Sequence, residues 1–378
     1  MIINYYEEEL RRLARQHLLR NPKNIQKFHS FNRIVINDKS YVNFSSNDYL
    51  GLTKNPVIIQ TAEKNSYEYG IGVASSRLIT GDTVVHRNLE EKIAKWHRKD
   101  AALVFSSGYS TNLGVISTLV GKSDAIVADR FVHASIIDGA KSSKAKLFIY
   151  PHNDIFKLSS ILEKNRCKFN KVLVVTESVF SMDGDIAPLQ DIIDVANFYD
   201  CLALVDEAHA IGVFGKTGSG LMETFGTISQ NFLIVGTLSK AIASNGGYLA
   251  GPQSIINYLF NKCRSFIYTT AISPVNCAIA LKAIEIIQNE SCLRKKLWSN
   301  IDYFHKIKKI DKQKTPIIPI IIGSALDTNK IMSRLFDDGF FVYGVRPPTV
   351  PKETSRLRIS LTSNHRKKDI KKLADRLP

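Results

Sequence analysis

The chain has 378 residues, of which 44% are hydrophobic and 23% charged, so it is long enough to form a large globular domain and a smaller one. Its net charge of +16 is compatible with a nucleic acid, a membrane surface or an acidic substrate and does not choose among them. The longest apolar runs are too short to cross a bilayer, and the five scattered cysteines, with no CxxC pair, indicate neither a disulfide framework nor a metal site.

Residues 1–45 are predominantly polar and are expected to form an arm, with a helix over Tyr5–Leu19 and a short apolar stretch at Arg33–Ile36. The first residues lack the apolar core of a secretory signal, so a cytoplasmic protein with no membrane partner is expected. Residues 285–378 mix strand and helix patterns and predict a small C-terminal α+β domain.

Between them, in residues 46–284, apolar runs alternate with segments of helical period, which predicts a large α/β domain with a mainly parallel sheet. Several runs are continuous and β-branched, as is typical of strands covered on both faces. The expected helices are Val57–Tyr69, Leu89–His97, Ile155–Asn165 and Leu189–Tyr199. The expected strands are Ala102–Phe105, Ala125–Ala128, Lys146–Tyr150, Val172–Thr176, Leu202–Val205, Leu233–Val235 and Tyr248–Ala250.

Reactive side chains follow five of these strands. Ligands of parallel sheets bind beyond the carboxyl ends of the strands, so these side chains are expected to form one site. They are Ser106–Tyr109, then Asp129 and His133, then Thr176–Ser178 with Ser181, then Asp206 and His209, and finally Thr237, Ser239 and Lys240.

Lys240 and Asp206 together indicate the chemistry of this site. Lys240 lies among small residues in GTLSKA, where a lysine can lose its proton and attack a carbonyl. Asp206 ends an apolar strand and needs a partner, and the protonated pyridine nitrogen of pyridoxal 5′-phosphate (PLP) is such a partner. Taken alone, Lys240 is more simply interpreted as an exposed loop lysine and Asp206 as a helix-capping aspartate.

The remaining strand-end residues suit the same cofactor. Ser107, Gly108 and Tyr109 stand at the start of a helical segment, where free backbone N–H groups bind phosphate. Thr237 and Ser239 add hydroxyls, and His133 is the candidate for stacking on the pyridine ring, although a lone histidine is more often structural.

Two other motifs resemble those of a helicase and a serine hydrolase, but the surrounding sequence lacks the residues that these functions need. Asp206–His209 spells the DEAH of some helicases, but no phosphate loop of the form GxxxxGK[ST] precedes it. Gly218–Gly220 is not a GxSxG elbow, because position 217 is Thr. No HExxH motif or Cys/His cluster suggests a metal.

Longer motifs occur along the chain in a fixed order. They are SSNDYLGL (Ser45–Leu52), TGDTVVHRNLE (Thr80–Glu90), FSSGYSTN, DRFVHAS, TESVFSMDGD (Thr176–Asp185), VDEAHAIGVFG, GTLSKA, RPPTVP and SRLRISLT. In order and spacing, from about residue 41 to the C-terminus, they resemble the α-oxoamine synthases. The resemblance implies a fold-type I PLP-dependent transferase and a homodimer.

The resemblance also implies roles for the site residues. Lys240 would hold PLP as a Schiff base and act as the catalytic base, and Asp206 would pair with the pyridine nitrogen. His209 and Ser181 would bind the phenolic oxygen, and His133 would stack on the ring and contact the substrate. The other cofactor residues would be Ser107, Gly108, Tyr109, Glu177, Thr237 and Ser239, with Thr270 reaching across a dimer interface. The substrate residues would be Asn47 and Arg358 for the amino-acid carboxylate, and Arg20 and Thr349 for the acyl donor.

The segment Arg346–Pro351 with Arg356–Arg358 is most similar to the family member that condenses L-alanine with a pimeloyl thioester, releasing CO₂, in biotin biosynthesis. The donor would be the ester of coenzyme A or of acyl carrier protein, both acidic partners for a basic chain. Val73 and Ala74 replace two glycines of the family pattern in the substrate region, so another α-oxoamine synthase using glycine or serine with a different acyl-CoA is the alternative.

Two functions outside this activity are also compatible with parts of the sequence. A basic nucleic-acid-binding protein would bind DNA or RNA in a salt-sensitive way and carry no chromophore. The second is a protein with a PLP fold that has lost catalysis, which the intact Lys240, Asp206 and His209 disfavour. No nucleic-acid partner is expected.

Overall fold

The computed structural model describes residues 2–30, 32–225, 232–311 and 313–378. Its internal contacts divide the chain into two compact units. The sheet unit comprises residues 52–180 and 186–294, and the terminal unit comprises residues 1–51, 181–185 and 295–378. The domain limits expected from the sequence (1–45, 46–284 and 285–378) stay a prediction, because contact density does not show which segments fold independently.

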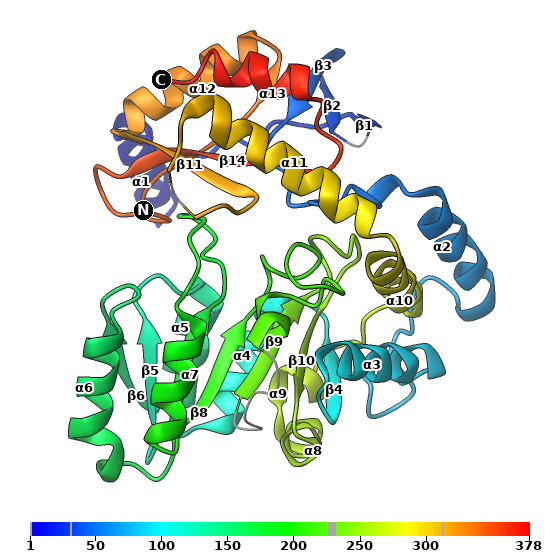
Figure 1. Cartoon of the computed structure of the whole chain (residues 1–378), viewed down its shortest axis with the longest axis vertical. Coiled ribbons are helices and arrows are strands. Elements are labelled where there is room, and N and C mark those ends of the chain that lie inside the picture. Colours follow the sequence, from blue (N-terminus) through cyan, green and yellow to red (C-terminus); the bar gives the residue numbers. More distant parts are fainter. Residues whose placement is uncertain (1, 31, 226–231, 312) are drawn as a thin grey trace. The chain divides into compact units, whose positions relative to one another are not determined.

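A seven-stranded sheet forms the centre of the sheet unit (Figure 1). The strand β10 is antiparallel to both of its neighbours, and the other paired strands are parallel, as the sequence predicted. All the expected strands are present. In spatial order they are β4 (Ala101–Phe105), β10 (Gly247–Gly251), β9 (Phe232–Thr237), β8 (Leu202–Asp206), β7 (Val172–Glu177), β5 (Ala125–Asp129) and β6 (Lys146–Tyr150).

The continuous apolar runs produce strands that are buried along their whole length, as in β5, β7, β9 and β10. Side chains of α4, α5, α8 and α9 pack on the strands in one apolar cluster. The helices of this unit are α2 (Pro56–Tyr69), α3 (Val84–His97), α4 (Gly108–Leu119), α5 (Ala134–Ser143), α6 (Ile155–Asn165), α7 (Leu189–Phe198), α8 (Gln253–Lys262), α9 (Arg264–Ile267) and α10 (Pro274–Asn289), with short 3₁₀ turns at Leu52–Lys54, Arg166–Lys168 and Leu221–Phe225.

The sequence analysis did not delimit α4, the helix that matters most for the site. Its sequence GYSTNLGVISTL is rich in Gly, Ser and Thr, which are poor helix formers. Capping compensates, because the Ser107 hydroxyl accepts a hydrogen bond from the N–H of Ser110 and the Ser110 hydroxyl accepts one from the N–H of Ser107. Burial of Val115 and Ile116 against the sheet adds packing that the local sequence does not reveal.

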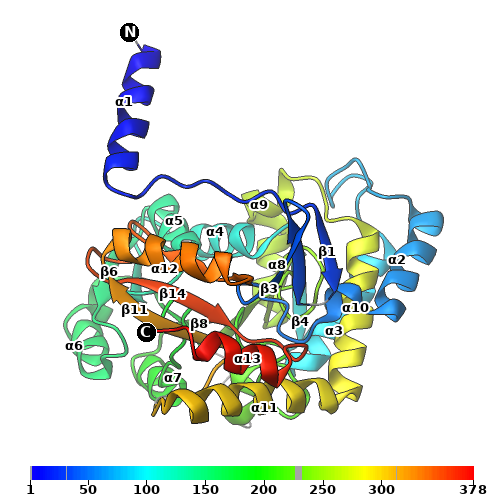
Figure 2. The same ribbon diagram turned by 90° about the horizontal axis from the view of Figure 1, so that it is seen from above.

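The terminal unit contains two small sheets. One is formed by β1 (Lys27–Ser30), β2 (Arg33–Ile36), β3 (Lys39–Asn43) and β12 (Phe340–Phe341), and the other by β11 (Ile317–Gly323), β14 (Ser355–Ser360) and β13 (Tyr343–Val345). Figure 2 shows α12 running over the second sheet. The helices are α1 (Ile2–Arg15), α11 (Ser291–Lys308, in this unit from Lys295), α12 (Ala325–Asp337) and α13 (Lys367–Ala374).

The N-terminal residues begin with the expected helix, but α1 ends at Arg15 and not at Leu19. His17 adopts a left-handed backbone conformation (φ 57°), which a helix cannot continue through. The apolar stretch Arg33–Ile36 is β2. Within the described residues, no helix has the length and apolar character needed to cross a bilayer.

The buried centre of the sheet gives a stability prediction. Leu204 in β8 is 0% exposed and belongs to the apolar cluster. We expect Leu204→Ala to lower the free energy of unfolding by about 2–5 kcal/mol, because it removes buried methyl groups and leaves a cavity. Urea denaturation followed by fluorescence measures this. Phe198→Ala is the control, since Phe198 is 82% exposed on α7 and should change stability by less than about 0.5 kcal/mol. Equal losses in the two variants would contradict the assigned core.

Candidate active site

The strand register brings the predicted reactive residues to one edge of the sheet. Glu177 at the end of β7 pairs with Asp206 at the end of β8, and Asp206 pairs with Val235 in β9. Gly247, at the start of the antiparallel β10, faces both Thr237 at the end of β9 and Phe105 at the end of β4. Four strand ends therefore meet where a parallel sheet binds its ligands.

A cavity of about 220 Å³ opens at this edge, within the sheet unit. Every residue predicted to bind the cofactor lines it except Ser181 and Thr270. Two lining residues that the sequence analysis did not single out are Asn112 and Ser135. Both lie one to four residues beyond predicted site residues, on α4 and α5, and only the helical geometry shows that they face the cavity.

Lys240 lies in the loop between β9 and β10 and is half-buried. Its Nζ is 2.9 Å from Nε2 of His209, which follows β8. At this distance the amine and the imidazole can share a proton. Such sharing suits an amine that attacks a carbonyl in one step and takes up a proton in another.

Asp206 is a buried carboxylate, 6% exposed, whose two oxygens each accept a hydrogen bond. Oδ1 accepts from the N–H of Ala208 at 2.9 Å, and Oδ2 accepts from Nδ2 of Asn112 at 2.8 Å. Two neutral donors do not replace the hydration of a charge, so this carboxylate is suited to a cationic partner on the cavity side.

Glu177 is the second buried carboxyl at this edge, 3% exposed, and its Oε1 has no hydrogen-bond partner among the described residues. Burial raises the pKa of Glu177 well above the usual range, and the adjacent Asp206 carboxylate raises it further. Lys240 and the backbone of His133 oppose these effects only in part. Burial and the neighbouring carboxylate therefore both favour the protonated form of Glu177.

His133 caps α5 with its side chain. Nδ1 accepts a hydrogen bond from the N–H of Ser135 at 3.2 Å and lies 2.8 Å from the Ser135 hydroxyl oxygen. The residue stays exposed although it lines the cavity, so its ring is available to a planar ligand. The cap shows the structural role of this histidine, and its stacking on the cofactor ring stays a prediction.

The start of α4 faces the end of β9. A Cβ on Gly247 would lie 2.6 Å from the backbone N of Gly108, so only glycine allows β10 to pass the helix start. Thr237 Oγ1 and Ser239 Oγ are 2.8 Å apart beside it. Helix N–H groups and two hydroxyls together form a cradle of donors suited to a phosphate.

The donor set fits PLP. The amine of Lys240 matches an aldehyde, the acceptor Asp206 matches a protonated ring nitrogen, and the cradle of Gly108, Thr237 and Ser239 matches a phosphate. Among the described residues, no group of His, Cys, Asp and Glu side chains is arranged to hold a metal ion.

The terminal unit contains the residues predicted to receive the amino-acid carboxylate. Arg358, on β14, donates from Nη1 to Asn47 Oδ1 at 3.1 Å and to Ser360 Oγ at 2.8 Å. Its Nε donates to the backbone oxygen of Ser181 at 2.6 Å. Tyr49 also donates to Asn47 Oδ1, at 3.2 Å, so the guanidinium is held in one orientation.

The two residues predicted for the acyl donor also meet in the terminal unit. Arg20 Nη2 donates to Thr349 Oγ1 at 3.3 Å. The arm is held beside them, because Arg346 and Asn329 both donate to the backbone oxygen of His17. The two predicted residues are 329 positions apart in sequence, so their contact is a long-range feature of the fold.

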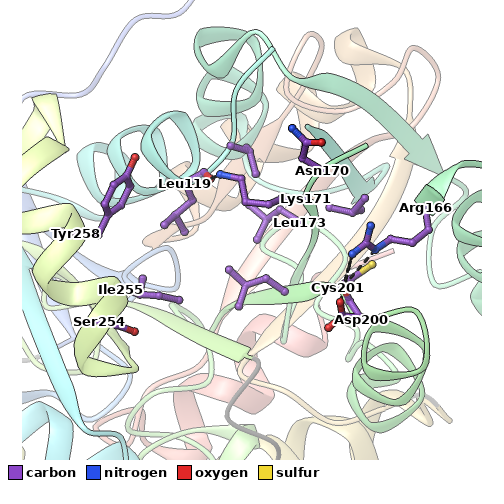
Figure 3. Close-up of a pocket in the computed structure, with 13 residues that line it drawn as sticks. Leu119, Arg166, Asn170, Lys171, Leu173, Asp200, Cys201, Ser254, Ile255 and Tyr258 are labelled. Carbon is purple, nitrogen blue, oxygen red and sulfur yellow. Dashed lines mark hydrogen bonds and ion pairs between the residues drawn. The ribbon is translucent and has the colours of Figure 1, made fainter. Parts of the chain in front are cut away.

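Thr270 is exposed between α9 and α10, outside the lining of the cavity. A larger hollow of about 460 Å³ lies at the opposite, amino-terminal edge of β7 and β8 (Figure 3). Its charged groups are used within its own wall: Arg166 binds Asp200, and Lys171 binds the backbone oxygen of Leu119 and Asp124. It offers neither an amine nor a carboxylate to a ligand in the way the first cavity does.

Comparison with known proteins identifies the family of the chain. The family model of aminotransferase class I and II matches residues 39–377. The 8-amino-7-oxononanoate synthase of Symbiobacterium thermophilum is 39% identical over 374 residues, covering 98% of this chain and 95% of that protein. The enzyme of the same name from Thermoanaerobacter pseudethanolicus is 39% identical over 343 residues, covering 89% and 87%.

Solved structures of related enzymes have the same fold. Serine palmitoyltransferase of Sphingomonas wittichii superposes with a TM-score of 0.92 at 30% identity, covering 99% of this chain and 95% of that one. The 8-amino-7-oxononanoate synthase of Francisella tularensis gives 0.77 at 31% identity, covering 89% and 96%. Serine palmitoyltransferase of S. paucimobilis was solved with bound PLP.

The chain belongs to the aminotransferase class I and II family and has the fold-type I architecture of PLP-dependent transferases. Within that family it is an α-oxoamine synthase, a PLP-dependent C-acyltransferase, as the sequence motifs indicated.

The raised pKa of Glu177 can be tested through stability. Its pKa is raised on folding, so the folded protein keeps a proton that the unfolded chain releases above the ordinary carboxyl pKa. The contribution of Glu177 to stability therefore falls as pH rises, whereas glutamine does not titrate. We expect the Tm of cofactor-free Glu177→Gln, relative to wild type, to be higher at pH 8 than at pH 5. The exposed Glu163→Gln on α6 is the control, and an equal offset at both pH values for Glu177→Gln would show that Glu177 is charged.

Proposed function

We propose that this enzyme condenses L-alanine with a pimeloyl thioester, giving 8-amino-7-oxononanoate, CO₂ and the free thiol, as in biotin biosynthesis. The observation that carries the proposal is the pairing of Lys240 with His209 in a cavity that also contains the buried carboxylate of Asp206. The names of relatives at about 40% identity support the choice of substrates.

PLP, when bound, supplies an electron sink for the electron pair left on the α-carbon of the amino acid. Lys240 Nζ is then the base that takes the α-proton and the acid that returns a proton to the product, with His209 Nε2 beside it. Asp206 would pair with the protonated ring nitrogen, and His133 would lie against the ring. The raised pKa of Glu177 favours its protonated form, which limits the negative charge next to Asp206.

Two further proposals concern the substrates. Arg358 and Asn47 receive the carboxylate of L-alanine, because a guanidinium held by Asn47, Ser360 and the backbone of Ser181 presents its Nη2 group in a fixed direction. Arg20 and Thr349 contact the acyl donor. The hydrogen bond between them keeps Arg20, in the N-terminal arm, close enough to Thr349 for both to contact one ligand.

The proposed assembly is a homodimer acting in the cytoplasm, with Thr270 completing the phosphate site of the partner. Thr270 is exposed on its own chain, as a residue that serves a neighbouring subunit would be. The acyl donor is proposed to be the ester of coenzyme A or of acyl carrier protein. Exposed lysines on α11, among them Lys295, Lys296 and Lys306, give either acidic donor a basic surface to approach.

A sister activity is the second candidate, because the serine palmitoyltransferase structure superposes with the higher TM-score. That score measures agreement of backbone paths, whereas the side chains that contact substrates vary with sequence. The sequence comparisons therefore weigh more for the substrate, and they favour 8-amino-7-oxononanoate synthase.

The proposal is tested with a panel of substrates. Purified holoenzyme is mixed with L-alanine, glycine or L-serine and with pimeloyl-CoA or palmitoyl-CoA, and thiol release and product mass are measured. We expect L-alanine with pimeloyl-CoA to give the highest kcat/KM, by about 100-fold or more, because each mismatch removes about 1–3 kcal/mol of transition-state binding. A preference for L-serine with palmitoyl-CoA would replace the proposal with the sister activity.

Arg358 provides a separate test of the carboxylate site. We expect Arg358→Lys to raise KM for L-alanine about 10–100-fold, because lysine keeps the charge but loses the fork that also binds Asn47 and Ser181. KM for the acyl donor should change little. Arg376→Lys, which alters an exposed pair with Asp338, is the matched control. An unchanged KM for L-alanine in Arg358→Lys would remove Arg358 from the substrate site.

A further inference from the structure

A one-way chain of hydrogen bonds joins Asp206 to His133 behind the cavity. Asn112 Nδ2 donates to Asp206 Oδ2 at 2.8 Å and to Ser135 Oγ at 3.0 Å. Ser135 Oγ is 2.8 Å from His133 Nδ1. Asn112 is 2% exposed and Ser135 0% exposed, so water does not compete for these bonds.

The chemistry of the groups fixes the direction of every bond in this chain. The Asp206 carboxylate only accepts, so the atom of Asn112 that meets it must be the amide nitrogen. The second proton of that nitrogen occupies the Ser135 oxygen, which leaves the hydroxyl proton free to donate to His133 Nδ1. That nitrogen also accepts the N–H of Ser135, so the proton of the neutral imidazole is on Nε2.

The other atom of the same amide has no part in the fold. Asn112 Oδ1 accepts no hydrogen bond from any residue that the structure describes. A buried asparagine with an unused oxygen is a poor choice for stability, because a buried acceptor without a hydrogen bond has lost its hydration without compensation. Its two donated bonds therefore point to a role in the site.

We propose that Asn112 is a positioning residue that sets the Asp206 carboxylate and, through Ser135, the His133 ring in one fixed geometry toward the cofactor. This inference rests on the proposed roles of Asp206 at the ring nitrogen and of His133 on the ring face. It does not depend on which amino acid or acyl donor the enzyme uses.

The experiment compares the affinity of the cofactor-free protein for PLP and for its 1-deaza analogue, in which CH replaces the ring nitrogen. Binding is followed by absorbance, without substrates. Asn112→Leu should raise the apparent Kd for PLP on the order of 10-fold, the size expected for a hydrogen bond to a charged group. For the analogue the rise should be about 3-fold or less, since no ring N–H then depends on Asp206.

Ser135→Ala separates the second half of the chain. It removes the bond to His133 but leaves Asn112 on Asp206, so it should weaken both cofactors by the same factor. The matched controls are Ser117→Ala on α4 and Ser143→Ala on α5. The Ser117 hydroxyl donates to backbone oxygens of α4, and the Ser143 hydroxyl donates to the backbone oxygen of Ala140 and accepts from the N–H of Ala145. Both controls should bind PLP and the analogue as wild type does.

Equal losses for PLP and the analogue in Asn112→Leu, or no loss for either, would overturn the inference. Should Asn112→Leu not fold, Asn112→Ala removes the same two donated bonds with a smaller side chain, and it should likewise weaken binding of PLP more than binding of the analogue. Asp206→Asn is measured in parallel. If Asp206→Asn fails to discriminate between the two cofactors, the proposed role of Asp206 fails; if it discriminates and both Asn112 variants do not, only the present inference fails.

Discussion

Burying the carboxylate of Asp206 imposes the constraint on which the rest of the site depends. A carboxylate at the end of an apolar strand loses its hydration, and the two neutral donors from Ala208 and Asn112 do not restore it. Stability alone would favour an apolar residue at this position. The raised pKa of the neighbouring Glu177 favours its protonated form, which reduces the repulsion between the two carboxyl groups. Charge, amine and phosphate cradle thus lie in one unit of the chain, on one sheet edge.

The sequence predicts this edge well because the sheet follows from local patterns. Runs such as Val172–Glu177 are apolar throughout, and the residue after each run falls at the same edge once the strands are parallel. The motif resemblance then attached roles to those residues. The positions of Ser181 and Thr270 outside the cavity lining were not foreseen, and their assigned roles remain proposals.

What the sequence does not reveal depends on long-range contacts. The parallel pairing of Phe340 with Val42 joins residues far apart in the chain, and no local pattern indicates that residues 1–51 pack with 295–378. The contribution of Asn112 is hidden for a related reason. The sequence pattern around Asn112, rich in Gly and Ser, predicts a loop. In the structure Asn112 belongs to the capped helix α4, which directs its side chain toward Asp206.

Both units show how a substrate-binding group can be oriented before its ligand arrives. In the terminal unit, Arg358 is held by Asn47, Ser360 and the backbone of Ser181, so little side-chain freedom remains to be lost on binding. In the sheet unit, His133 and Asp206 are held by Ser135 and Asn112. Such preorganisation places rigid polar groups where charge develops during the reaction.

The central claim is that Lys240 is the amine to which PLP attaches. Reduction of the holoenzyme with borohydride, followed by proteolysis and mass spectrometry, measures it directly. The account predicts that the peptide containing Lys240 gains the mass of the reduced phosphopyridoxyl group and that no other lysine does. Labelling of a different lysine, or of none, would contradict the account.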